Sequence, residues 1–283
     1  MKLCRFDTDR LGLVLGDMVA DVSAVLDDLP AWRWVPPPGD ALIAALPDLR
    51  PRIQALAETA PRLPLAGLRL AAPVAAPSKV IGAPVNYHDH LDEAQADADL
   101  HHGQTVHPID RMGCFLKATS ALAGHGAVIA LPFDDRRVDH EAEVAVVIGR
   151  TAHKVPAEAA LAHVAGYALA LDMTVRGPQE RSLRKSCDGF AVLGPWLVTA
   201  DEIADPGAIG FELTVNGTAR QASDTRYLIR SIPELIEMVS AFYTLHPGDV
   251  IMTGTPAGVA PVAPGDVVVV TSPALGRLEV SIG

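Results

Sequence analysis

Residues 138–149 constrain the fold most, because this largely apolar run carries two glutamates two positions apart. Alternate side chains of a β-strand point to the same face of a sheet, so Glu141 and Glu143 are expected to project together. The same alternation puts Ala145 and Val147 on the carboxylate face and packs the opposite face into a core, formed by Ala142, Val144, Val146 and Ile148. Neighbouring like charges repel, which predicts a neutralising partner such as a divalent cation. The alternative is a solvated edge strand whose glutamates face water.

The composition limits the classes of protein to which the chain can belong. A chain of 283 residues can bury one substantial core with a smaller module beside it. Its net charge of -11 argues against a nucleic-acid partner, although a bound cation can still attract an anionic substrate. No apolar run is long enough to span a membrane, and no signal-peptide segment is expected. The three cysteines fit no zinc pattern, so we expect reduced thiols and a cytoplasmic location.

The distribution of prolines and apolar runs divides the chain into two regions. Residues 1–72 are expected to form a small N-terminal domain, and residues 73–283 a strand-dominated catalytic domain. No glycine-rich loop joins a strand to a helix, which excludes a Rossmann arrangement. Polar, acidic residues 92–110 are predicted to be mobile, within a lid at about 88–110. Expected strands are 3–6, 11–15, one that opens at 80–82 and ends at 86–90, 167–172, 250–253, 267–271 and 278–282. Expected helices are 40–60, 156–164 and 235–243, the last after a capping box at Ser231 and Glu234.

Asp172 is the third carboxylate of interest, because it ends an apolar run that reads as a strand. An aspartate that caps a turn is the alternative reading of this position. If Asp172 converges with Glu141 and Glu143, the three oxygen donors suit a hard cation such as Mg²⁺ or Mn²⁺. Such an ion keeps open positions for water or for a chelating substrate.

Cationic side chains follow Asp172 in the chain. Arg176 and Lys185, with Gln179 between them, are candidates for holding a substrate carboxylate. Arg181 and Arg184 are expected to belong to a solvated basic loop.

His90 and Glu93 are three residues apart, so one helical turn would bring their side chains together. A histidine oriented by a carboxylate is a suitable general base for activating water near neutral pH. The alternative is an ordinary surface pair.

Taken together, residues 79–283 resemble the fumarylacetoacetate hydrolase family. The matching blocks, in chain order, are Asn86 and Tyr87 with His90 and Glu93, residues 115–117 with 120–122, residues 139–143, Asp172 with Arg176, Lys185 with Asp188, Phe190 and residues 193–196, and a nearly complete match at 248–259. Three positions depart from the family pattern: His140 stands where tyrosine is usual, Thr119 where proline is usual, and Gly177 where aspartate is usual. These departures concern recognition of the substrate and leave the carboxylates intact.

The resemblance implies a fold and a site. It implies an α+β, mostly β fold of packed mixed β-sheets, a β-sandwich roll, with flanking helices, and it implies a homodimer. The site residues that it implies are Glu141, Glu143 and Asp172 for Mg²⁺ or Mn²⁺, His90 and Glu93 on a closing lid, Lys185 as a substrate and oxyanion contact, and Arg176, Gln179, Gly254, Thr255 and Tyr87 around the substrate.

The predicted activity is metal-dependent hydrolysis of a C–C bond in an acylpyruvate-like 2-oxo or 1,3-dicarbonyl acid. In this interpretation His90 deprotonates water, which attacks the distal carbonyl of a small anionic substrate. Two alternatives stay open at this point. One is decarboxylation, isomerisation or hydration of a 2-oxo acid in aromatic catabolism, and the other is a binding protein that has lost turnover.

Overall fold

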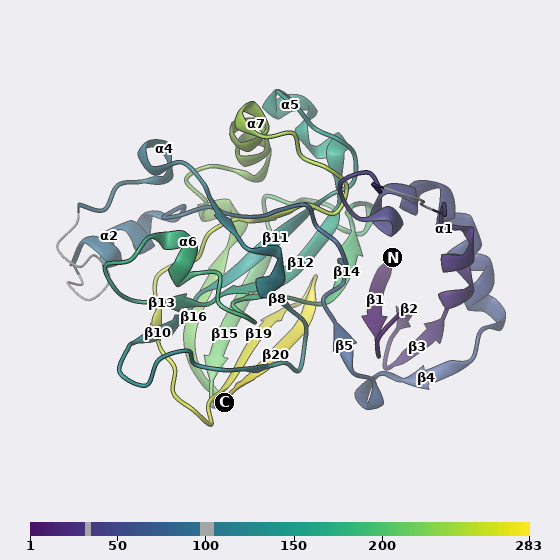
Figure 1. The fold of residues 1–283 in the computed structure, drawn as a ribbon, viewed down its shortest axis with the longest axis horizontal. Coiled ribbons are helices and arrows are strands. Elements are labelled where there is room, and N and C mark those ends of the chain that lie inside the picture. Colours follow the sequence, from purple (N-terminus) through teal and green to yellow (C-terminus); the bar gives the residue numbers. More distant parts are fainter. Residues whose placement is uncertain (32–34, 97–104) are drawn as a thin grey trace.

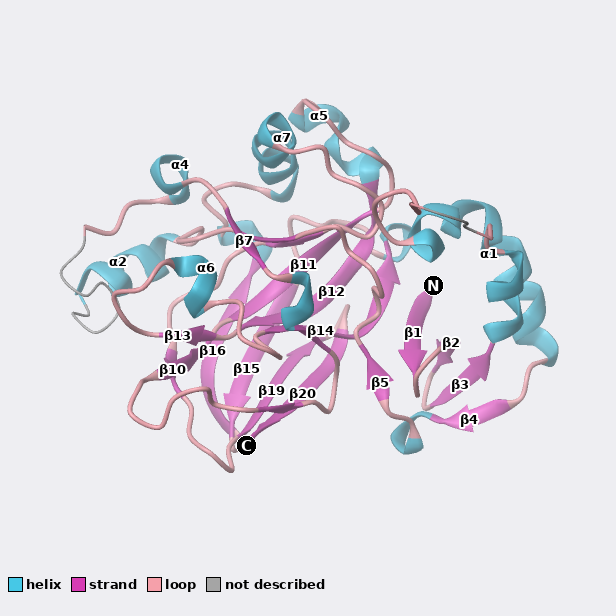
Figure 2. Ribbon diagram, in the orientation of Figure 1, coloured by secondary structure: helices cyan, strands magenta, loops and turns pink. Residues whose placement is uncertain are grey.

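The computed structural model describes residues 1–31, 35–96 and 105–283, and its framework is a set of mixed β-sheets with helices on the outside (Figures 1 and 2). The largest sheet has 12 strands. The order across it is β4 (Arg62–Pro64), β3 (Met18–Asp21), β2 (Arg10–Leu15), β1 (Lys2–Phe6), β14 (Ala191–Thr199), β12 (Val164–Asp172), β11 (Ala142–Ile148), β17 (Val250–Met252), β6 (Val80–Gly82) and β7 (Phe115–Lys117), with β5 (Leu70–Ala71) beside β1 and β8 (Leu122–Ala123) beside β14. The predicted α+β, mostly β fold is confirmed.

Two smaller sheets complete the strand framework. The order of the five-stranded sheet is β16 (Thr218–Asp224), β15 (Gly210–Val215), β19 (Val267–Ser272), β20 (Gly276–Ile282) and β9 (Val128–Ile129). The three-stranded sheet contains β13 (Thr174–Val175), β10 (Val138–His140) and β18 (Ala260–Pro261). Most neighbouring strands are antiparallel, but β6 and β17 are parallel, as are β8 with β14 and β9 with β20.

The helices lie around the sheets. The α-helices are α1 (Ala41–Thr59), α2 (His88–Ala96), α4 (Ile109–Met112), α5 (Ala157–Ala160), α6 (Arg181–Arg184) and α7 (Ile232–Phe242), and 3₁₀ turns span Ser23–Asp28, Leu65–Gly67, Thr119–Ala121, Leu161–His163, Ala200–Glu202 and Thr225–Tyr227. The predicted capping box starts α7, since the backbone N–H of Ser231 donates to Glu234 over 2.8 Å. The expected helix 156–164 is present as the short α5 followed by a 3₁₀ turn. The strand expected to open at 80–82 and end at 86–90 is shorter than predicted, since β6 ends at Gly82 and α2 begins at His88.

Strand β11 is buried along its whole length between β12 and β17, so the alternative of a solvated edge strand is wrong. Its two faces enter two different hydrophobic clusters, as alternation predicts. One cluster, shared with the five-stranded sheet and α7, contains Ala142, Val144, Val146 and Ile148. The other, shared with α1, contains Ala145 and Val147. The carboxylate-bearing strand is therefore a rigid central element of the molecule.

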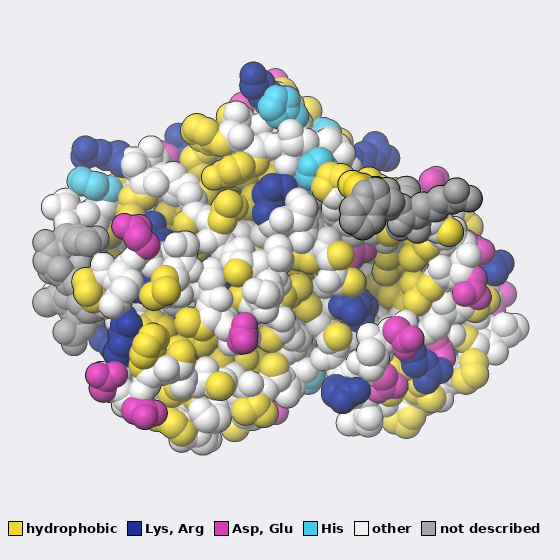
Figure 3. Space-filling model, in the orientation of Figure 1, with side chains coloured by type: hydrophobic (Ala, Val, Ile, Leu, Met, Phe, Trp, Pro, Cys, Tyr) yellow, Lys and Arg dark blue, Asp and Glu magenta, His cyan; other side chains and the backbone are white. Residues whose placement is uncertain are grey.

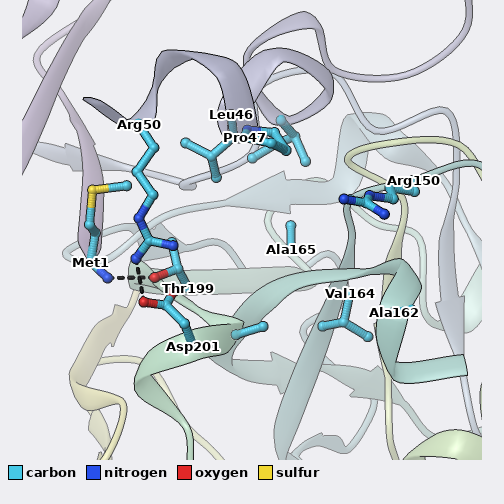
Figure 4. Close-up of a pocket in the computed structure, with 13 residues that line it drawn as sticks. Met1, Leu46, Pro47, Arg50, Arg150, Ala162, Val164, Ala165, Thr199 and Asp201 are labelled. Atoms are coloured by element: carbon cyan, nitrogen blue, oxygen red, sulfur yellow. Dashed lines mark hydrogen bonds and ion pairs between the residues drawn. The ribbon is translucent and has the colours of Figure 1, made fainter. Parts of the chain in front are cut away.

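The N-terminal strands continue the main sheet, because Lys2 and Leu3 of β1 pair with Val198 and Leu197 of β14. Figure 4 shows the junction between α1 and the end of β14, where Arg50 forms an ion pair with Asp201. The boundary at residues 72 and 73 stays a prediction.

Charged side chains of both signs are scattered among hydrophobic and uncharged ones on the face shown in Figure 3. On the face in Figure 3, lysines and arginines are interspersed with acidic side chains and do not gather into a basic patch. Within the described ranges, no helix has the length and apolar character needed to cross a membrane. Residues 92–96 of the segment that we predict to be mobile belong to α2, and residues 97–104 lie outside the described residues.

Candidate active site

Three buried carboxylates meet where β11 and β12 lie side by side. Glu143 lies in β11, Glu141 precedes this strand, and Asp172 ends β12. The backbone N–H of Asp172 donates to the carbonyl of Glu141 over 2.9 Å, which continues the antiparallel pairing up to the site. One carboxylate oxygen from each residue lies within 4.8 Å of the others, and the three residues are 5%, 2% and 1% exposed. The structure thus brings together the three residues predicted as metal ligands.

Lysine and arginine side chains neutralise part of this negative charge. Lys185, just after α6, donates hydrogen bonds of 2.7 Å to Glu141, to Asp172 and to the hydroxyl of Thr174. Arg176 donates from Nη2 to Glu141 over 2.8 Å, and from Nε to Asp139 over 2.6 Å. Close cations of this kind allow carboxylates to stay ionised when buried.

The pKa values of Glu141 and Glu143 shift in opposite directions. Burial raises the pKa of Glu141, but the charges of Lys185 and Arg176 more than offset this effect, so it lies below its ordinary value. Burial and the negative charge of Asp172 raise the pKa of Glu143 well above its ordinary value. Glu143 accepts a hydrogen bond of 2.7 Å from the backbone N–H of Gly254. Within the described residues, no lysine or arginine forms an ion pair with Glu143.

The donor set fits a hard divalent cation. Glu143 is a buried carboxyl group whose hydrogen-bond donor in the described structure is one backbone N–H, and its raised pKa shows that the surrounding residues compensate its ionised form poorly, so a cation beside it would favour that form. Three converging carboxylates and no thiolate match the oxygen-rich ligands that Mg²⁺ and Mn²⁺ prefer. The alternative that Asp172 only caps a turn is wrong, because its side chain forms ion pairs with Lys117 and Lys185.

His90 and Glu93 form the predicted pair on one turn of α2. His90 Nδ1 lies 3.0 Å from Glu93 Oε2, and Glu93 Oε1 accepts from the backbone N–H of Gly258 over 2.9 Å. His90 is buried, so the alternative of an ordinary surface pair is wrong. Because Nδ1 faces the carboxylate, Nε2 is the ring atom left for water or substrate.

A small pocket of about 100 Å³ joins this histidine to the carboxylate site. The charged residues on its wall are His90, Glu141, Arg176, Arg181, Arg184 and Lys185. The expectation that Arg181 and Arg184 belong to a solvated loop is therefore wrong. Local sequence could not reveal their position, because the pocket that both side chains line also contains His90 and Glu141, which are distant in the chain.

The other predicted substrate contacts lie in different places. Gln179 is exposed and accepts a hydrogen bond of 2.7 Å from Arg136, so the structure does not bring it into this pocket. Gly254 supports Glu143 through its backbone. Thr255 and Tyr87 are buried beside the site without lining the pocket, and the hydroxyl of Tyr87 has no hydrogen-bond partner in the described structure.

Two residues of the site were not predicted from the sequence. Lys117, at the end of β7, donates to Asp172, although its block had been matched to the family. Gln221 of β16 accepts from the backbone N–H of Ala142 over 2.9 Å and donates to Thr255 and to the carbonyl of Pro256 over 2.8 and 2.9 Å. Nothing in the local sequence identifies Gln221, because these partners are 34 to 79 residues away.

Gln221 also explains how one departure from the family pattern is accommodated. Its Oε1 lies 3.2 Å from Nδ1 of His140, and an amide oxygen can only accept, so this nitrogen carries the proton. Burial lowers the pKa of His140. The imidazole is thus a neutral link between β10 and β16.

Comparison with known proteins identifies the family of this chain. The family model for the fumarylacetoacetate (FAA) hydrolase C-terminal region matches residues 79–282. The chain is 51% identical to maleylpyruvate hydrolase of Aquipseudomonas alcaligenes, over 100% of this chain and 99% of that one.

Solved structures extend the similarity to the fold. Maleylpyruvate hydrolase from Sphingobium sp. SYK-6, in complex with manganese(II) ion and pyruvate, matches with a TM-score of 0.84 and 39% identity, over 100% of this chain and 98% of the other. The 5-carboxymethyl-2-hydroxymuconate delta-isomerase from Mycobacterium smegmatis matches with a TM-score of 0.72 and 32% identity, covering 100% and 99%. This chain is a member of the fumarylacetoacetate hydrolase family.

Proposed function

We propose that this protein is a metal-dependent hydrolase that cleaves the C–C bond of an acylpyruvate such as maleylpyruvate, releasing pyruvate and a carboxylic acid. The observation that carries the proposal is that His90, bonded to Glu93, lines the same pocket as Glu141 and Lys185. A general base and a cation-binding carboxylate site thus face one small space. The identity of 51% over the whole chain with a maleylpyruvate hydrolase supports the same conclusion.

Glu141, Glu143 and Asp172 would hold the divalent ion, Mg²⁺ or Mn²⁺. When bound there, such an ion supplies Lewis-acid polarisation of a substrate oxygen and stabilises developing negative charge.

The side chains around this site have separate tasks. Arg176 has guanidinium N–H groups beyond those bonded to Asp139 and Glu141, and it offers them to the carboxylate and 2-oxo group of the pyruvate part. Lys185 adds positive charge, since its three N–H groups already donate to Glu141, Asp172 and Thr174. The Nε2 atom of His90 takes a proton from water, and Glu93 keeps the imidazole oriented and stabilises its positive charge. Lys185 stabilises the oxyanion that forms at the attacked carbonyl.

The reaction needs no reactant other than the substrate and water. The water oxygen bonds to the distal carbonyl carbon, and the bond between this carbon and the methylene carbon breaks. Its electron pair stays on the pyruvate fragment, which becomes pyruvate by accepting one proton on that carbon. The other fragment leaves as a carboxylic acid.

Isomerisation is the second candidate, because a solved isomerase matches the chain over its full length. It would use the same cation site and would not need the water that His90 activates. The products separate the two activities, since hydrolysis divides the substrate and isomerisation keeps its mass.

The test is to offer the Mn²⁺-loaded protein a panel of maleylpyruvate, fumarylpyruvate, acetylpyruvate and oxaloacetate and to measure the release of pyruvate. We expect pyruvate from the acylpyruvates, with loss of activity after chelation of the metal and recovery on adding Mn²⁺. Turnover that is unaffected by chelation would overturn the proposal, as would conversion without pyruvate.

The proposal includes a homodimer in the cytoplasm. Three free cysteines accord with a reducing compartment. Light scattering of the purified protein would test the dimer, and a monomer at working concentration would contradict it.

A further inference from the structure

Arg181 stands apart from the other cationic side chains of the pocket. Arg176 is paired with Asp139 and Glu141, and Lys185 with Glu141 and Asp172. Across residues 1–31, 35–96 and 105–283, the guanidinium of Arg181 forms neither an ion pair nor a hydrogen bond. Its contact is with the ring of Phe115, whose centroid lies 5.4 Å from the guanidinium carbon.

The neighbouring Arg184 gives a direct comparison on the same short helix. Its Nε donates to the carbonyl of Gln179 over 2.8 Å, and its Nη1 donates to the carbonyl of Val175 over 3.3 Å. Arg184 thus has protein acceptors, whereas Arg181 has only an aromatic face. Both line the pocket that also contains His90 and Glu141.

A partly buried guanidinium group loses part of its hydration, and without a hydrogen-bond acceptor nothing offsets the free-energy cost of this loss. Burial lowers the pKa of Arg181, and the nearby carboxylates Glu141 and Asp172 oppose this effect only in part. The planar fork of arginine matches a carboxylate with two parallel hydrogen bonds. Phe115 holds the group by a cation–π contact without using its N–H donors.

The pocket already contains donors for the pyruvate end of a substrate. The free N–H groups of Arg176 and the positive charge of Lys185 serve that end beside the carboxylates, so the unused donors of Arg181 are available to another anionic group of the same molecule. An acyl chain that ends in a carboxylate supplies such a group, and an acyl chain that ends in a methyl group does not.

We propose that Arg181 binds the carboxylate at the far end of the acyl group, and that the enzyme thereby selects dicarboxylic acylpyruvates over neutral ones. This inference rests on the proposed function and names the substrate class of the same site. Arg181 is a substrate-binding residue in this account, and Phe115 is the positioning residue that keeps its donors free.

The experiment compares Arg181→Gln with the parent on a matched pair of substrates, maleylpyruvate and acetylpyruvate, with Mn²⁺ present. For maleylpyruvate we expect kcat/KM to fall about 10- to 100-fold, the usual size of a lost hydrogen bond between charged groups. For acetylpyruvate we expect a change within about twofold, because the scissile bond and the pyruvate part are the same. Arg181→Lys should recover part of the loss, since it keeps the charge without the fork.

Leu183→Gln is the control, because Leu183 lies on the same helix and is 54% exposed outside the pocket. It should leave the kcat/KM of both substrates unchanged. Equal losses for the two substrates in Arg181→Gln would overturn the inference, as would no loss for either.

A binding measurement separates this inference from the proposed function. If the parent hydrolyses neither substrate, the proposed function fails, and calorimetry still compares the affinities of the two compounds for parent and Arg181→Gln. A selective loss for maleylpyruvate would support the role of Arg181, and an equal affinity of parent and variant would overturn it.

Discussion

Lys185 donates a hydrogen bond of 2.7 Å to Asp172, so an ammonium group shares a carboxylate with the proposed cation site. The ammonium group of Lys185 and a bound divalent cation would therefore be close neighbours. Both can be present only if the carboxylates of the site carry enough negative charge to offset their repulsion. Glu143 matters most in this balance, because within the described residues no lysine or arginine forms an ion pair with it.

Glu143→Gln should weaken the binding of Mn²⁺, because a hard cation needs charged oxygen ligands to compensate for its lost water. The rise in melting temperature on adding Mn²⁺ should shrink with it, since the stabilisation by a ligand at fixed concentration grows with the logarithm of the ratio of that concentration to the Kd. Calorimetry and thermal unfolding measure the two effects. Glu212→Gln is the matched control, because Glu212 is an exposed glutamate of β15. Unchanged Mn²⁺ affinity in Glu143→Gln would exclude this residue as a ligand.

In the metal-free protein the same substitution should stabilise the fold at neutral pH. The raised pKa of Glu143 means that the folded state binds this proton more tightly than the unfolded state. The protonated carboxyl group of Glu143 therefore contributes its full stabilisation below about pH 4.3, the pKa of a glutamate in the unfolded chain. This stabilisation is lost as the pH rises through the higher pKa that Glu143 has in the folded state. Glutamine does not ionise, so the variant does not lose stability in this way. The free energy of unfolding of Glu143→Gln should therefore exceed that of the parent by an amount that grows with pH. Urea unfolding with chelator at several pH values measures it, and a difference independent of pH would contradict the assignment.

His90→Ala should reduce hydrolysis by about 10²- to 10⁴-fold, the usual contribution of a positioned general base. The affinity for Mn²⁺ should stay the same, because the three carboxylates do not depend on the imidazole. His88→Ala, on the exposed side of α2, is the control. Hydrolysis at the parental rate in His90→Ala would leave the pair with a structural role only.

Gln221→Met should lower the free energy of unfolding by about 1–3 kcal/mol, because it leaves the buried N–H of Ala142 without its acceptor. It should also lower kcat, since Gln221 fixes the loop from Gly254 to Gly258, whose backbone holds both Glu143 and Glu93. Denaturant unfolding and steady-state kinetics measure these effects. Gln54→Met changes an exposed side chain of α1 and should alter neither quantity. A stable variant with full activity would show that these hydrogen bonds have no such role.

Local patterns predicted the parts of the site that lie within one element. Alternation in β11 placed its two faces correctly, and the spacing of His90 and Glu93 predicted their contact on α2. The family, the fold and the divalent cation followed from several ordered motifs, and the comparisons agree with them.

The remaining contacts depend on how distant elements meet. Lys117 reaches Asp172 across 55 positions, and Gln221 joins β16 to β11, so no local window contains either pair. Arg181 resembled a solvated residue because its surroundings in the sequence are polar, whereas in the fold it faces the pocket and the ring of Phe115.

Hydrolysis of maleylpyruvate in ¹⁸O-labelled water tests the central claim most directly. The account predicts pyruvate and a second acid in equal amounts, with one ¹⁸O atom in the carboxylate formed at the cleaved bond, and it predicts that chelation of the metal stops the reaction. A product with the mass of the substrate, or release of CO₂ without a labelled acid, would contradict it.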